Sequence, residues 1–565
     1  MDASLSVPPH LRQYVVTQDY AAYTEEDQAV WRFVLLQTFE RLTRTAHAAY
    51  ASGLSAAGLS VDRIPRIAHM SERLSEHGFG AVCVDGFIPP RAFSAFQANG
   101  FLPIAADIRT SKHLAYTPAP DIIHEAAGHA PFLAHPAYAS YLRRIGAVSE
   151  RAFSDAYDRE LYQAVYLLSE VKEDPASTPA QIAAAEAQLE ALTHRATAPS
   201  EAALLARLYW WTVEYGLVGT LEDFRLYGAG LLSSLGEGHF CHEERVTKLP
   251  LTAACIEMAY DITRPQPQLY VARDFEQLER VLEDVEATLS YRRGGMPALR
   301  AALASGEPAT FELGDDVQLA GVLSHIEADG WLELAGPCAL AFEHAIRPGW
   351  PRAERYVLPL GATTDGRALG ELGPDALRRY THDGWLELQT RAGVHVRGRP
   401  LDVTFRAGRA RAVLLAEFEL RARGQLLLRS TEPYPLALAT EAVTASADLP
   451  DGFHAQTEFA AKRVPKPRQF DAAQRRLIEL YEQTRELLRA GCGGGVVGRF
   501  EKIYAELEVG YPDEWLLRWN LLEGLVKLGE KASLGERIAQ QLEGMELRFA
   551  HREPIATGLA YLRSQ

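Results

Sequence analysis

The sequence predicts three regions of different fold class: a mainly α N-terminal domain, a β-rich domain and a C-terminal helical region. Helical patterns prevail from residue 1 to about 295, alternating and β-branched segments from about 311 to 449, and helical patterns again after Pro465-Lys466-Pro467. A length of 565 residues also suits several domains. We therefore predict domains at 1–298, 299–464 and 465–565.

The N-terminal domain opens with a strong helix-start signal. Thr24 suits the N-cap position, acidic residues fill the first turn, and Trp31 begins an apolar stripe. A second long helical pattern, from about Ala156 to Leu192, contains Pro175 near its middle. Because proline removes a helical hydrogen bond and clashes with the preceding turn, we expect two helices there.

The β-rich region consists of alternating segments separated by turn pairs such as Asp365-Gly366. The hexapeptide Asp-Gly-Trp-Leu-Glu-Leu occurs twice in it, at 329–334 and 383–388. Either a duplicated hairpin or a chance similarity between two strands explains this repeat.

The C-terminal region returns to helical spacing. Leu477, Tyr481 and Thr484 lie on one stripe, and Pro512 suits the start of a further helix. The run from Gly491 to Gly498 lacks the Gly-Lys-Ser/Thr ending of a phosphate-binding loop, so we interpret it as a flexible connection between helices.

Composition and charge exclude several classes of protein. The 58 basic and 74 acidic residues give a net charge of −16, which disfavours nucleic acid as a partner. Five scattered cysteines without a Cys-x-x-Cys pair are not a disulfide framework. We find no export signal and no apolar run of membrane-spanning length, so we expect a cytoplasmic protein without membrane contact. The oligomeric state is not predicted.

The strongest chemical signal is the run from His124 to His129, two histidines five residues apart with Glu125 between them. Zinc peptidases place the two histidines four residues apart, on one helical face. A spacing of five puts the side chains roughly 140° apart on an ideal α-helix. Both reach one metal ion only if His124 lies at a helix entrance, outside regular geometry, and Pro120-Asp121 just upstream suits such an entrance.

A third ligand is expected from the aromatic segment Tyr209-Trp210-Trp211-Thr212-Val213-Glu214-Tyr215. Glu214 is a single acid in an apolar run, and burying an unpaired carboxylate is costly. Metal ligation stabilises such a group, and so does an ion pair with an arginine or lysine elsewhere. Two imidazoles and one carboxylate on one face are the ligand set of mononuclear iron sites that activate oxygen.

Several segments, in a characteristic order, resemble the catalytic domain of the pterin-dependent aromatic amino acid hydroxylases, the family of phenylalanine, tyrosine and tryptophan hydroxylases. The resemblance covers residues 80–296. It rests on five segments: Ile108-Arg109-Thr110-Ser111-Lys112, Tyr116 to Asp121, His124 to His129, Tyr209 to Leu217, and Tyr227 to Glu237. The sequence is most similar to long bacterial phenylalanine 4-monooxygenases.

The resemblance implies a mainly α catalytic domain of aromatic amino acid hydroxylase type, with Fe(II) and a tetrahydropterin, tetrahydrobiopterin or a relative, as cofactors. It implies a monooxygenase that uses O₂ to convert L-phenylalanine to L-tyrosine, in phenylalanine catabolism; a tyrosine or tryptophan hydroxylase is the alternative within the family. A zinc hydrolase with Glu125 as general base and a non-catalytic binding protein are the alternatives outside it.

Roles for individual residues follow from the same resemblance. The implied iron ligands are His124, His129 and Glu214. The implied substrate-binding residues are Arg109, Thr117, Pro120, Trp210, Tyr215 and Ser233. The implied pterin-binding residues are Gly86, Ile88, Phe93, Glu125, Ala206 and Tyr209.

Some features lie outside the family pattern. Phe96 is expected to be an ordinary core residue, and His239 and His242 are expected not to form a second metal site. Ala126-Ala127 stands where well-studied members usually have leucines, and the segment between His129 and Glu214 is unusually long. Neither the role of that segment nor that of residues 300–565 is predicted.

Overall fold

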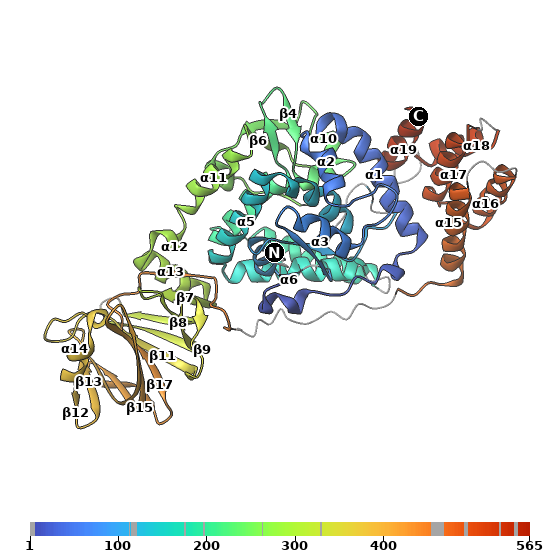
Figure 1. Cartoon of the computed structure of the whole chain (residues 1–565). Coiled ribbons are helices and arrows are strands. Elements are labelled where there is room, and N and C mark those ends of the chain that lie inside the picture. Colours follow the sequence, from blue (N-terminus) through green and yellow to red (C-terminus); the bar gives the residue numbers. More distant parts are fainter. Residues whose placement is uncertain are drawn as a thin grey trace. The chain divides into compact units, whose positions relative to one another are not determined.

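The computed structural model describes residues 6–86, 88–111, 114, 121–173, 177–195, 198–262, 264–327, 330–453, 468–490, 495–529, 533–546 and 552–564. The chain divides into two compact units. Unit 1 comprises residues 1–147, 206–282 and 461–565, and unit 2 comprises 148–205 and 283–460. A mainly helical N-terminal region, a β-rich region and C-terminal helices follow one another along the chain (Figure 1), which confirms the predicted fold class. The domain boundaries at 298 and 464 stay a prediction.

Short helices and two small sheets make up the chain as far as residue 293. The helices are α1 (Glu25–Thr45), α2 (Ala49–Ala56), α3 (Ile67–Ser75), α4 (Pro90–Ala98), α5 (Pro136–Arg151), α6 (Ala156–Glu173), α7 (Pro179–Thr193), α8 (Glu201–Tyr209), α9 (Ala229–Ser233), α10 (Glu237–Phe240), α11 (Glu276–Glu286) and α12 (Ser290–Arg293). The 3₁₀ and π turns are η1 (Pro9–Tyr14), η2 (Tyr20–Ala22), η3 (His124–His129), η4 (Ala130–Ala134), η5 (Trp210–Glu214) and η6 (Ala253–Glu257).

Two small sheets border the helices of unit 1. Strands β1 (Gly80–Val84) and β2 (Phe101–Ala105) pair in parallel. The second sheet has the order β4-β3-β6-β5. Its strands are β3 (Leu217–Gly219), β4 (Phe224–Leu226), β5 (Thr247–Pro250) and β6 (Gln268–Ala272).

Helix α1 begins as its sequence predicts. The Thr24 hydroxyl accepts a hydrogen bond from the Asp27 backbone N–H, and the Asp27 carboxylate accepts one from the Thr24 backbone N–H. This reciprocal capping satisfies two donors that a helix start leaves free. Trp31 and Phe33 of α1 are both fully buried.

The long helical pattern before Glu214 splits into α6 and α7, as predicted, although Pro175 itself lies outside the described residues. The Tyr157 hydroxyl donates to the Leu192 carbonyl, so the start of α6 lies beside the end of α7. The extra residues between His129 and Glu214 therefore form an antiparallel helical hairpin.

The β-rich region of unit 2 contains two six-stranded sheets that share one hydrophobic core. One has the order β10-β9-β8-β7-β18 with β11 on β9, and the other has the order β12-β13-β14-β15-β16 with β17 on β15. The strands are β7 (Pro308–Glu312), β8 (Val317–Glu327), β9 (Trp331–Phe342), β10 (Ala345–Ile346), β11 (Ala353–Pro359), β12 (Thr381–His382), β13 (Trp385–Gln389), β14 (Val394–Arg406), β15 (Arg409–Ala422), β16 (Gln425–Ser430), β17 (Tyr434–Ala437) and β18 (Thr444–Ser446). The remaining elements are α13 (Gly295–Ser305), η7 (Leu369–Glu371) and α14 (Pro374–Arg379).

The repeated hexapeptide has the same place in both sheets. Each copy leads from a turn into a strand, β9 at Trp331 and β13 at Trp385, and each strand pairs antiparallel with the strand before the turn. The glutamate of each copy forms an ion pair with an arginine of a neighbouring strand, Glu333 with Arg355 and Glu387 with Arg397. These matching contacts favour the duplicated hairpin over chance similarity.

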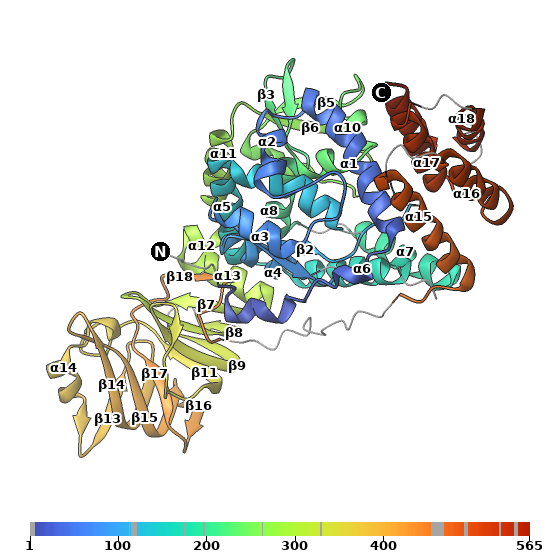
Figure 2. The same ribbon diagram turned by 45° about the vertical axis from the view of Figure 1, so that its right-hand side comes forward.

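The C-terminal helices α15 to α19 belong to unit 1 (Figure 2). They are α15 (Ala472–Ala490), α16 (Val496–Gly510), α17 (Leu516–Lys527), α18 (Ser533–Glu546) and α19 (Arg552–Ser564). Two predictions need correction. The helix expected from Pro512 begins at Leu516, with Trp515 as its N-cap, and Gly498 lies inside α16 rather than in a connection. Within the described ranges, no helix has the length and apolar content needed to cross a membrane.

Candidate iron site

Both histidines of the predicted motif lie on a π turn, η3. A π turn has hydrogen bonds between residues five apart, so it brings residues i and i+5 to one face. The Asp121 carboxylate accepts a hydrogen bond from the backbone N–H of His124 at 3.0 Å, so this histidine does lie at a helix entrance, as predicted. The π turn removes the separation of roughly 140° that an ideal α-helix would give the two histidines.

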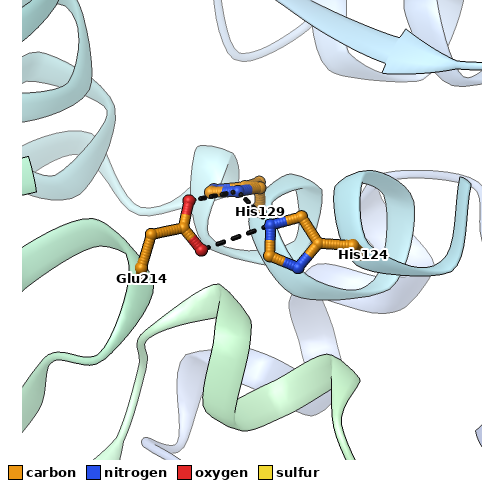
Figure 3. A group of neighbouring side chains, drawn as sticks. All are labelled: His124, His129 and Glu214. Carbon is orange, nitrogen blue, oxygen red and sulfur yellow. Dashed lines mark hydrogen bonds and ion pairs between the residues drawn. The ribbon is translucent and has the colours of Figure 1, made fainter. Parts of the chain in front are cut away.

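Glu214 ends a second π turn, η5, which continues α8. Its carboxylate faces the two imidazoles, with one oxygen toward each ring (Figure 3). Oε2 is 3.2 Å from Nε2 of His124, and Oε1 is 3.2 Å from Nε2 of His129. The two Nε2 atoms are also 3.2 Å apart. Neighbouring ligands about 2.1–2.2 Å from a metal ion lie about 3 Å from one another, so these spacings fit one ion bound on a single face.

The charges of the site are coupled because it is buried. Burial opposes the charged form of His124, but the adjacent Glu214 carboxylate outweighs it and raises the pKa of this imidazole to about 9. Burial also raises the pKa of Glu214, yet the two histidines together hold it well below the usual range. The Glu214 carboxylate thus favours a positive charge beside it, which a bound metal ion also supplies.

Ser233 fixes the tautomer of His124. Its hydroxyl donates to the carbonyl of Ala229 at 2.8 Å, so its oxygen accepts from Nδ1–H of His124 at 3.0 Å. This leaves the lone pair of Nε2 free for a metal ion, which is how supporting hydrogen bonds usually orient a metal-bound histidine.

Glycines let α9 approach both ligand turns closely. A Cβ on Gly228 would lie 2.4 Å from the carbonyl oxygen of Glu214, and a Cβ on Gly128 would lie 2.9 Å from Ala229. Alanine at either position would therefore push α9, and with it Ser233, away from His124. Ala126 and Ala127 behind the site are buried.

Arg109 forms a buried ion pair with Asp121, not the surface salt bridge that is the ordinary alternative for an arginine. Its Nε and Nη2 donate to the two Asp121 oxygens at 2.7 and 2.8 Å, and Nη1 donates to the Ser233 carbonyl at 3.2 Å. The side chains of Arg109 and Asp121 are 2% and 3% exposed. One N–H on each of Nη1 and Nη2 is not used by these bonds, so the end of the guanidinium can still receive a carboxylate.

Three aromatic rings form a stack beside the ligands. Trp210 lies between Tyr215, at 4.6 Å between ring centroids, and Tyr260, at 4.3 Å. The Tyr215 hydroxyl donates to the Glu237 carboxylate. Tyr260 was not predicted from the sequence, because it lies 45 residues after Tyr215 and in no recognisable motif. The roles of Asp121 as the partner of Arg109 and of Glu237 as the partner of Tyr215 were not predicted either.

The predicted pterin-binding residues have more varied surroundings. Phe93 contacts Tyr209 edge-on at 6.1 Å, and the Tyr209 hydroxyl accepts from the buried Gln97 amide at 2.7 Å. Glu125 is buried, and its Oε2 has no hydrogen bond with any described residue. Gly86 has a positive φ, Ile88 packs at the edge of a core cluster and Ala206 is exposed.

The remaining residues named from the sequence are Thr117, Pro120, Phe96, His239 and His242. Thr117 and Pro120 lie outside the described residues. Phe96 is a core residue, as predicted. His239 and His242 belong to no metal-type cluster in the described part of the chain, where His124, His129 and Glu214 form the one such group. His242 instead stacks on Phe224.

The comparisons with known proteins point to one family. The family model for biopterin-dependent aromatic amino acid hydroxylases matches residues 14–173 and 180–292. Phenylalanine-4-hydroxylase from Caulobacter vibrioides is 27% identical over 341 residues, 59% of this chain and 96% of that protein. The rat enzyme (Rattus norvegicus) is 29% identical over 277 residues, 47% of this chain and 50% of that protein. Chromobacterium violaceum phenylalanine hydroxylase with bound iron(III) and 7,8-dihydrobiopterin is 25% identical, covers 50% of this chain and 92% of that chain, and has a TM-score of 0.38.

Two imidazoles and one carboxylate on a single face define the ligand set of a mononuclear non-haem iron oxygenase. Residues 14–173 and 180–292 belong to the biopterin-dependent aromatic amino acid hydroxylase family.

Proposed function

We propose that this protein is a cytoplasmic monooxygenase that hydroxylates L-phenylalanine to L-tyrosine with O₂, Fe(II) and a tetrahydropterin. The observation that carries the proposal is the His124, His129 and Glu214 cluster beside the free end of Arg109 and the stack on Trp210. The names of the relatives support phenylalanine as the substrate; tyrosine and tryptophan are the other candidates.

Iron and pterin together supply the activation of O₂ when they are bound. The protein positions the amino acid. The Nη1–Nη2 end of Arg109 binds the substrate carboxylate, while Asp121 holds the other edge of the guanidinium and so fixes its plane. Ser233 supports both ends of the site, because its carbonyl accepts from Arg109 and its hydroxyl accepts from His124.

The ring of the substrate lies against the edge of the Trp210 indole. Tyr215 and Tyr260 stack on this indole and restrict its rotation. Burial of His129, which is 0% exposed, keeps water from the far side of the ligand set.

The residues that would hold the pterin are Phe93, through its ring, and Gly86 and Ile88, through their backbone. Ala206 and Tyr209 would contribute from α8. Oε2 of Glu125 lies 3.7 Å from Nε2 of His129 and accepts no hydrogen bond from a described residue, so it is available for a hydrogen bond to the pterin.

Anaerobic reconstitution tests the proposal. The protein is loaded with Fe(II) or, as the control, with Zn²⁺, and then receives O₂, tetrahydrobiopterin and one aromatic amino acid at a time. Mass spectrometry should show that phenylalanine gains one oxygen atom with the Fe(II)-loaded protein and none with the Zn²⁺-loaded protein. Faster turnover of tyrosine or tryptophan would show that phenylalanine is not the main substrate. Activity restored by Zn²⁺ would rule out the proposed iron-dependent reaction.

A further inference from the structure

The C-terminal helices pack on the first helix of the catalytic region through an aromatic cluster. Phe33 of α1 meets Trp515 and Trp519 edge-on, at 5.1 and 4.8 Å between ring centroids. Gly558 of α19 lies so close that a Cβ would be 2.9 Å from the ring of Phe33. Phe33 and Trp519 are 0% exposed, so this contact has the character of a protein core.

Ion pairs tie the same helices to the start of α1. Arg468, which precedes α15, donates to both oxygens of Asp27 and, at 2.9 Å, to the carbonyl of Ala22. Arg485 of α15 pairs with Glu25. About two turns after Glu25, Arg32 pairs with Glu523 of α17, whose side chain is 2% exposed. Figures 1 and 2 both show α15 and α17 next to α1.

The start of α1 also holds the loop that carries Arg109. The Tyr23 hydroxyl donates to the carbonyl of Ala106, and the Ser111 hydroxyl donates to Glu26 at 3.2 Å. Arg109 lies between these two anchor points, in residues 106–111, which have no regular secondary structure. One turn of α1 thus faces the C-terminal helices on one side and the Arg109 loop on the other.

We infer that residues 468–564 are a positioning element for the substrate carboxylate: through Arg468 and Arg485 they fix the first turn of α1, and Glu26 of that turn fixes the Arg109 loop through Ser111. The inference rests on the proposed function, in which Arg109 binds the amino acid. It assigns a task to the C-terminal helices and makes Arg468, Arg485, Glu26 and Ser111 positioning residues.

The charge of Arg468 acts on Glu26 directly. Burial, Glu514 of the C-terminal helices and the adjacent Asp27 raise the pKa of Glu26 to about 7, while the Ser111 hydrogen bond and Arg468 oppose this rise. The Glu514 carboxylate is itself held by the Tyr481 hydroxyl at 2.7 Å and the Leu517 N–H at 3.0 Å. Removing Arg468 takes away a positive charge that opposes the rise in the pKa of Glu26, so Glu26 holds its proton to a higher pH and accepts a weaker hydrogen bond from Ser111.

The experiment uses the full chain with Fe(II) and compares Arg468→Ala/Arg485→Ala with Arg476→Ala. Arg476 is the matched control, since it pairs with Glu479 and Glu506 inside the C-terminal helices. The double variant should raise KM for the amino acid about fivefold, with kcat and the pterin KM within about twofold of the wild type, and the control should change none of the three.

Ser111→Ala removes the hydrogen bond between the Arg109 loop and Glu26 of α1. This substitution leaves the C-terminal helices unchanged, so its effect does not depend on how they fold. It should raise the amino acid KM as the double variant does, and the triple variant should be no worse than either, because the residues act in series. The inference would be overturned if the KM increases of the double variant and of Ser111→Ala multiplied in the triple variant. It would also be overturned if kcat and the KM values for the amino acid and the pterin all worsened equally in every variant.

Hydrogen exchange of residues 106–111 in the iron-loaded protein separates this inference from the proposed function, because it needs no turnover. Exchange there should quicken in the double variant and in Ser111→Ala but not in Arg476→Ala. Unchanged exchange overturns the inference even if phenylalanine is hydroxylated; quickened exchange upholds the mechanical connection even if the substrate differs.

Discussion

Asp121→Asn should destabilise this protein more than any other single exchange of one polar side chain for another near the site. The carboxylate of Asp121 accepts four hydrogen bonds: three from the backbone N–H, Nε and Nη2 of Arg109, and one from the backbone N–H of His124. In asparagine an NH2 group replaces one carboxylate oxygen, so N–H groups of Arg109 or His124 face another donor instead of an acceptor. The Arg109 guanidinium, whose side chain is 2% exposed, also loses its counter-charge.

Breaking a buried ion pair by removing one partner costs about 3–5 kcal/mol, and Asp121→Asn keeps the volume, so the cost is electrostatic rather than a cavity. The matched control is Asp223→Asn, since the Arg225–Asp223 pair is 48% and 77% exposed and should contribute under about 1 kcal/mol. Urea unfolding at neutral pH gives both values.

The pH dependence gives a second check. Arg109 holds the pKa of Asp121 below its usual range despite the opposing effect of burial. A depressed folded-state pKa contributes stability that is present above the unfolded value, about 3.9, and is lost as the pH falls below it. Asp121→Asn should remove this part of the acid sensitivity. A loss of less than about 1 kcal/mol at neutral pH would refute the argument that this pair is a buried structural charge.

Three further predictions concern the metal, the ring pocket and the start of α1. His129→Ala should abolish iron retention, measured by metal analysis, while circular dichroism stays unchanged; normal iron content would remove His129 from the ligand set. Trp210→Phe should narrow the preference for phenylalanine over tryptophan in kcat/KM by about tenfold, because a smaller wall admits the indole; an unchanged ratio would place the ring elsewhere. Glu26→Gln should remove a loss of stability of roughly 1–3 kcal/mol that the wild type shows as the pH rises from about 4.5 to 7, since the folded protein keeps a proton on Glu26 that the unfolded chain releases; parallel stability curves would contradict the raised pKa.

The sequence by itself determined the parts of the molecule that depend on local patterns. The helix start at Thr24, the division between α6 and α7 and the change to strands after residue 300 follow from capping, proline and alternation, which act over a few residues. The iron ligands could also be predicted from the sequence, because two histidines and an isolated acid in apolar surroundings restrict the chemistry even before their distances are known.

Only the tertiary structure decided how these residues meet. The π turns that bring His124 and His129 to one face are rare, and no pattern of residue types marks them. Tyr260 joins the stack on Trp210 from a distant part of the chain. The docking of α15, α17 and α19 on α1 joins residues more than four hundred positions apart. Such contacts depend on complementary shape and charge between surfaces that exist only after the chain has folded, so local periodicity carries no record of them.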